Sequence, residues 1–103
     1  MTIEINMSTR NKAAFADGIY SEEKTVVKSG GRISATFHGN DKIAAIRLDR
    51  QCVSKDGTIL KDCEFNTPSE AAQFVNGNIS NGYRAWKVNG INLGDYLKNQ
   101  GLR

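Results

Sequence analysis

Alternation of apolar and polar residues marks the start of the chain and predicts a strand there. Residues 2–6 read Thr-Ile-Glu-Ile-Asn, a pattern typical of a strand with one buried face. A polar stretch without a clear period follows, before the apolar run Ala13–Ala16. We therefore expect residues 1–17 to form an N-terminal edge strand and a loop, and residues 18–103 to form a single compact domain.

The pattern between residues 24 and 37 predicts a β-hairpin. Residues 24–28 are rich in β-branched side chains, and residues 29–31 contain two adjacent glycines, which tolerate a positive φ. Residues 32–37 then alternate strictly between polar and apolar. Every second residue of this last run, beginning with Ile33, shares one face, and we expect that face to be buried.

Helical signals occur in three segments. Residues 42–52 place apolar side chains at helical spacing behind an Asn-Asp pair that can cap a helix. The strongest signal covers residues 68–76, because Thr67 can cap that helix, a proline suits its first position, and Gly77 can end it in the left-handed conformation. Residues 91–97 carry leucine and tyrosine at helical spacing and predict a short third helix.

Residues 83–88 alternate between two Asn-Gly turns and predict another strand. The alternation places Trp86 and Val88 on one face, and Tyr83 and Lys87 on the other. We expect Trp86 to be buried against the alanine-rich side of the helix that precedes it. Together these elements predict an α+β fold, in which two to three short helices pack on a small antiparallel sheet.

The composition fits one globular domain. The chain has 103 residues, of which 39% are hydrophobic and 24% charged, and its net charge is +3. A chain of this size has its own core but little room for a second domain. It lacks an apolar run of about 18 residues, and its first residues lack the apolar core of a signal peptide. We therefore expect a cytoplasmic protein without a membrane partner; the sequence leaves its oligomeric state open.

Soft metal ligands are few. The sequence contains Cys52, Cys63 and one histidine, His38, without a C-x-x-C pair. These are too few for a closed zinc site, so we expect two reduced, partly buried thiols and a solvent-facing histidine. The carboxylates of Asp62 and Glu64 lack the surrounding pattern of a nuclease metal site. We predict no catalytic residue, no metal and no cofactor, and hence no enzyme.

Two motifs near the C-terminus resemble a known family. Residues 67–77 read T-P-S-E-A-A-Q-F-V-N-G, and residues 80–87 read S-N-G-Y-R-A-W-K. Together with the lysine- and glycine-rich segment upstream, they resemble a small bacterial domain family of unknown function. That family occurs C-terminal to GIY-YIG-type nucleases and is related to domains associated with restriction enzymes and adenine methylases. Thr67 and Tyr83 stand where its pattern usually has serine and tryptophan, and both keep the role of the residue replaced.

The resemblance, which covers residues 18–97, implies a DNA-associated binding module. Its partners would be DNA and a nuclease or methyltransferase, which the module would serve as a separate small protein. The triplet Gly18–Tyr20 spells Gly-Ile-Tyr but lacks the rest of the nuclease motif, so it does not indicate the nuclease itself. The alternative is a protein-interaction or regulatory module that docks on a partner enzyme.

Basic residues concentrate between Lys24 and Arg50, where six cations accompany two acidic residues. Two of these cations flank the two-glycine turn, whose backbone N–H groups can also face a phosphate. A second group of polar and aromatic side chains follows the Asn81–Gly82 turn. We expect both groups to face the same solvent-exposed surface and to bind nucleic acid. The predicted binding residues are Lys28, Ser29, Arg32, Asn81, Tyr83, Arg84 and Lys87.

Overall fold

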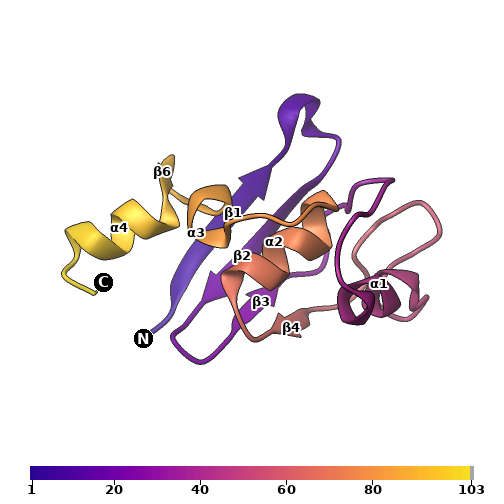
Figure 1. Cartoon of the computed structure of the whole chain (residues 1–103), viewed down its shortest axis with the longest axis horizontal. Helices are drawn as coiled ribbons and strands as arrows, with labels where there is room; N and C mark the ends of the chain where they lie inside the picture. The colour runs from indigo at the N-terminus through magenta and orange to yellow at the C-terminus, as the bar shows by residue number, and fades with distance from the viewer. Residues whose placement is uncertain (103) are drawn as a thin grey trace.

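The structure is a computed structural model that describes residues 1–102, except for the side chain of Asn11. Over this part of the chain six strands form one antiparallel sheet with the order β4-β3-β2-β1-β5-β6 (Figure 1). The predicted α+β fold is confirmed. The strands are β1 (Ile3–Ser8), β2 (Phe15–Tyr20), β3 (Thr25–Val27), β4 (Cys63–Phe65), β5 (Lys87–Val88) and β6 (Ile91–Asn92). The helices are α1 (Asp41–Leu48), α2 (Pro68–Asn76), α3 (Gly82–Ala85) and α4 (Leu93–Asn99), with a 3-10 turn η1 (Arg10–Lys12).

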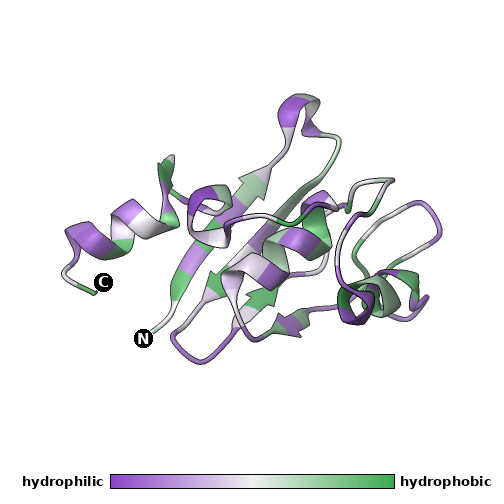
Figure 2. Cartoon of the chain, in the orientation of Figure 1, coloured by the Kyte–Doolittle hydropathy of each residue, from purple (hydrophilic) through white to green (hydrophobic). Residues whose placement is uncertain are grey.

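Helices cover one face of the sheet and leave the other face bare. Helix α2 lies over β2, β3 and β4, and contacts α1 and α3 at its sides (Figure 1). Polar and apolar residues alternate along β1 and β2 (Figure 2), because one side of each strand packs against the helices and the other side meets water. No helix in the described part of the chain is long and apolar enough to cross a membrane.

The N-terminal strand lies inside the sheet, which corrects the prediction of an edge strand. Strand β1 pairs with β2 along its whole length, from Ile3 opposite Tyr20 to Ser8 opposite Phe15. On its other side Asn6 pairs with β5. The alternation of residues 2–6 did predict the strand, but a period of two does not tell whether one or both edges of a strand are paired.

The predicted hairpin over residues 24–37 does not form. Strand β3 pairs with β2 on one side and with β4 on the other, so neither of its edges is free for residues 32–37. Gly30 does turn the chain with a φ of 100°. The chain then runs on to the start of β2, where Arg32 pairs with Phe15 and, on its other side, with Thr58.

Helix α2 begins and ends where the sequence predicts. The Thr67 hydroxyl accepts a hydrogen bond from the Glu70 amide (3.1 Å), and Gly77 ends the helix with a φ of 82°. A side chain at Gly77 would also collide with the Thr36 carbonyl. The predicted first helix is confirmed as the shorter α1, capped by the Asn40 side chain, which accepts from the Ile43 amide (2.9 Å).

Residues 83–88 are only partly a strand, which corrects that prediction. The first half is the short helix α3, because the Asn81 side chain accepts from the Tyr83 amide (3.0 Å) and so caps a helix instead of closing a turn. Trp86 directly follows this helix and is fully buried, as predicted. The second Asn-Gly pair is a turn as predicted: Asn89 and Gly90 both have positive φ and join β5 to β6.

Candidate nucleic-acid interface

The predicted binding residues do not share one surface. Lys28 and Ser29 follow β3 on the bare face of the sheet. Asn81 caps α3 and Arg84 lies within it. The Tyr83 ring packs edge-on against the buried Tyr20 ring with centroids 6.3 Å apart, on the helix-covered side.

Lys87 belongs to the bare face but lies away from Lys28. Its backbone pairs with Asn6 on β1, which in turn pairs with Asp17 on β2, and the Lys28 amide donates to the Asp17 carbonyl (2.9 Å). The two lysines are therefore about three strand spacings, or roughly 14 Å, apart. The Lys87 ammonium donates to the Arg84 carbonyl (3.0 Å).

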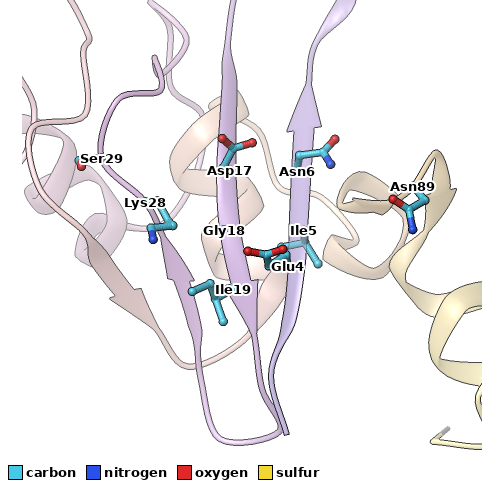
Figure 3. A pocket seen from close by; sticks show the side chains of 9 residues that line it. All are labelled: Glu4, Ile5, Asn6, Asp17, Gly18, Ile19, Lys28, Ser29 and Asn89. Atoms are coloured by element: carbon cyan, nitrogen blue, oxygen red, sulfur yellow. The ribbon is translucent and has the colours of Figure 1, made fainter.

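The bare face contains a groove of mixed charge, which we call the sheet groove. It has a volume of about 510 Å³ and runs across β1, β2 and the end of β3 (Figure 3). The carboxylates of Glu4 and Asp17 lie in it together with Lys28 (Figure 3). Beside it Lys24 pairs with Glu64 (3.2 Å). Because carboxylates repel phosphates, the sheet groove is a poor place for a nucleic-acid backbone.

A second hollow, the basic cleft, concentrates positive charge. It has a volume of about 350 Å³ and lies where the end of α1 meets the loop from residue 32 to 35 and the turn from residue 53 to 57. Its charged lining residues are four cations and one carboxylate: Arg32, Arg47, Arg50, Lys55 and Asp56. Of these, only Arg32 was among the predicted binding residues.

Arg47 forms the buried part of this cleft. Its side chain is 7% exposed and donates to the carbonyls of Phe74 (3.1 Å), Thr36 (3.2 Å) and Ser34 (2.5 Å). Its guanidinium also lies over the Phe37 ring, 4.8 Å from the centroid. Burial lowers the pKa of Arg47 from its ordinary value, but an arginine remains charged at neutral pH. In the described part of the chain no carboxylate pairs with it, so its charge adds to the potential of the cleft.

Asp56, the one carboxylate of the cleft, is committed to the turn that carries it. It accepts hydrogen bonds from the Ser54 hydroxyl and from the Thr58 amide (3.1 Å). These bonds, with a smaller contribution from the charge of Arg32, lower the pKa of Asp56 to about 2. The Arg32 guanidinium is 4.0 Å from Asp56 and half exposed, so it keeps donors for another partner.

The other two cations of the cleft face solvent. Lys55 is exposed, and Arg50 makes one long hydrogen bond of 3.5 Å to the Val53 carbonyl. Arg32, Arg50 and Lys55 together present guanidinium and ammonium donors along the cleft, a donor set that suits phosphate oxygens. The high cation count of residues 24–50 already contained two of these three residues, but no local pattern brings them to Lys55.

The titratable groups outside the cleft offer little chemistry. Cys52 and Cys63 are free and buried, and burial together with the neighbouring Cys52 thiol raises the pKa of Cys63 to about 11. A thiol of that pKa is a poor nucleophile at neutral pH. His38 is exposed. Among the described residues no group of three or more His, Cys, Asp or Glu side chains could hold a metal ion. The cation-rich lining of the basic cleft is suited to binding an anion.

A comparison with known families finds one match, which covers most of the chain. Residues 6–97 match a family described as a domain of unknown function (DUF4357). The match includes the second half of β1, residues 6–8, which lies outside the segment of resemblance noted from the sequence. No curated protein and no solved structure matches the chain.

Proposed function

We propose that this chain, which belongs to the DUF4357 family, is a non-catalytic DNA-binding module that contacts phosphates through the basic cleft. The observation that carries the proposal is the charge of the cleft, where four cations meet one carboxylate that is already hydrogen-bonded within its own turn. The mixed charge of the sheet groove argues against a phosphate-binding role for Lys28.

The chemistry of the cleft favours phosphodiesters over single carboxylates. Two guanidinium groups, on Arg32 and Arg50, offer planar forks that match phosphate oxygens, and Lys55 adds a mobile point charge. The buried charge of Arg47 strengthens the attraction without needing to move. Contacts of this kind fix a protein on the DNA backbone and carry no sequence information by themselves.

The proposal includes a biological setting. The sequence resembles domains that accompany nucleases and restriction enzymes, so we propose that the module serves such a system as a separate chain, bound to DNA, to a nuclease or methyltransferase, or to both. Two free thiols are typical of a reducing compartment such as the cytoplasm, which we propose as the location of the protein.

Fluorescence anisotropy of a labelled DNA duplex tests the proposal at low and at moderate salt. We expect the wild-type chain to bind at low salt, and the Arg50→Glu plus Lys55→Glu variant to lose binding. The Arg50→Ala plus Lys55→Ala variant should make the plot of log binding constant against log salt concentration less steep by about 1.8, since each phosphate contact contributes about 0.9 to that slope. Lys98→Glu, at the exposed end of α4, is the matched control. Undetectable affinity of the wild type at low salt, or a charge-reversed variant that binds normally, would refute the proposal.

Docking on a partner protein is the second candidate. Leu48 lines the cleft and is 71% exposed, although large apolar side chains are usually buried. This candidate predicts binding to a nuclease or methyltransferase that is insensitive to salt. That binding would be lost in Leu48→Asp and kept in the charge-reversed variant.

A further inference from the structure

Phe15 is unusual among the aromatic residues of this protein. Of the aromatic side chains in residues 1–102 it alone is exposed, at 40%. It stands at the start of β2 on the bare face of the sheet and lines a hollow of about 410 Å³, which we call the Phe15 groove. An exposed ring on an open sheet face adds little to the core, so its position needs another explanation.

Two cations come from segments next to Phe15. The Phe15 amide donates to the Arg32 carbonyl (3.0 Å), and the Arg32 amide donates to the Phe15 carbonyl (2.9 Å). Residues directly opposed in an antiparallel pair carry their side chains on the same face, so the Arg32 side chain leaves the sheet beside the Phe15 ring. Lys12, in the turn that joins β1 to β2, lines the Phe15 groove.

Polar groups stand in the next row of the same face. Asn6 and Asp17 are opposite each other on β1 and β2, and both line the Phe15 groove and the sheet groove. Figure 3 shows their side chains next to each other on the bare face. An amide and a carboxylate can form hydrogen bonds with the donors and acceptors on the edge of a nucleobase. Asp17 also explains why this row suits a base edge better than a phosphate.

We infer that Phe15 stacks against an unpaired nucleobase, with Arg32 and Lys12 bound to the adjacent phosphates and with Asn6 and Asp17 facing the edge of the base. The ligand class is therefore a single-stranded stretch of nucleic acid. The inference rests on the proposed function, because Arg32 lines the basic cleft and its backbone pairs with Phe15. It also narrows that function, because the bases of an intact duplex are stacked on each other and cannot stack on a ring in a sheet.

Charge decides between a nucleic acid and an apolar peptide as the occupant. A peptide that used Phe15 as an apolar contact would gain nothing from the charges of Arg32 and Lys12. A single strand uses both, since aromatic stacking and backbone neutralisation act together on every nucleotide.

Anisotropy titrations with a labelled single strand, and with the duplex of the same sequence, test the inference. Phe15→Ala should weaken single-strand binding by roughly 5- to 150-fold, which corresponds to the stacking of one base, and should leave duplex binding unchanged. Phe15→Tyr should keep the affinity, because it keeps the ring. Phe15→Leu should lose it, because it keeps apolar area but not the ring. Leu60→Ala, at another exposed apolar position, is the matched control and should bind like wild type.

A direct signal comes from Phe15→Trp. The native Trp86 is fully buried and gives a constant background, so quenching by added single strand reports on position 15. Thermal melting of each variant checks that it folds.

The possible failures are distinguishable. Equal affinity for single strand and duplex, with no effect of Phe15→Ala, overturns the inference while the charge-reversed cleft variant still tests the proposed function. A Phe15→Leu variant that binds like wild type also overturns it and indicates an apolar contact, as a peptide would make. Absence of binding to both nucleic acids at low salt overturns the inference and the proposed function together.

Discussion

The two ends of α2 are fixed to the rest of the molecule in different ways. At the N-terminal end the neutral indole of Trp86 is fully buried and donates to the Pro68 carbonyl (3.0 Å). At the C-terminal end the Arg47 guanidinium donates to the Phe74 carbonyl and to two carbonyls of the loop before α1. A cation is favourable at that end, because the C-terminus of a helix carries partial negative charge.

This difference between the two ends of α2 predicts different effects on stability and on binding. At the Trp86 end, burial of the indole stabilises the fold, and the indole itself carries no charge. The Arg47 end is held by a cation without a carboxylate partner, and it adjoins the basic cleft that Arg47 also lines. One side chain there supports the fold and contributes to the electrostatic potential. We therefore expect changes at the Trp86 end to alter stability alone, and changes at the Arg47 end to alter both stability and affinity for anions.

The largest effect is expected from Trp86→Ala. It removes the largest fully buried side chain and leaves a cavity, so it should lower the free energy of unfolding by about 3–5 kcal/mol. Urea unfolding followed by circular dichroism measures it. Under conditions where the variant is still folded, its affinity for DNA should match that of the wild type. A loss of binding in the folded variant would contradict the separation of the two ends.

Arg47→Met should have the next largest effect. Methionine fills similar volume but removes the guanidinium donors from the carbonyls of Phe74, Thr36 and Ser34, of which Thr36 keeps a bond from the Ser34 hydroxyl (2.9 Å). We therefore expect a loss of about 2–4 kcal/mol in unfolding free energy. DNA binding of the folded fraction should also weaken, because a charge of the cleft is gone. Arg50→Met is the matched control: it should weaken binding and leave unfolding unchanged, since Arg50 is exposed. Normal DNA affinity in folded Arg47→Met would show that the buried charge does not reach the ligand.

Much of α2 and its neighbours could be predicted because the signals are local. Thr67 and Gly77 act on backbone groups within the helix itself, and each determines one helix end through its own hydrogen bond or φ. The burial of Trp86 follows from its size and the small number of places where a domain of this length can bury it. Neither prediction depends on which segments, distant in the sequence, pair with each other.

The pairing of segments that are distant in the sequence could not be predicted. The Gly30–Gly31 turn is real, but it could not reveal that β4, formed by Cys63–Phe65, already occupies the free edge of β3. Asn81 favours a turn and a helix cap equally, and the Ser69 hydroxyl, which accepts from the Gly82 amide, supports the cap. In the basic cleft, Arg32 comes from a β-bridge, Arg50 from the segment after α1, and Lys55 from a turn. No regular spacing in the sequence relates these three residues.

A smaller effect is expected at the N-terminal end of α2 from Thr67→Ala. The variant loses the hydroxyl that accepts from the Glu70 amide and should lower the free energy of unfolding by about 1 kcal/mol. Thr67→Ser keeps the cap and should be close to wild type. Both should bind DNA normally if charge at the other end of the helix determines affinity. A Thr67→Ser loss equal to that of alanine would show that the methyl group, and not the cap, matters.

The smallest effect concerns pH, and it should appear on the Arg47 side alone. Hydrogen bonds from Ser54 and Thr58 lower the pKa of Asp56 from 3.8 to about 2. Because the pKa in the folded state is the lower one, the ionised carboxylate stabilises the turn above about pH 3.8, and this contribution is lost as the pH falls toward 2. NMR titration should show the Thr58 amide shifting with a midpoint near the pKa of about 2, and Asp56→Asn should remove that step. The Trp86 indole signal should not follow the same curve, since the indole does not ionise and lies at the opposite end of α2. A midpoint near 3.8 for Thr58 would mean that the turn does not hold the carboxylate, which would leave Arg32 more closely paired with Asp56 and less free for a phosphate.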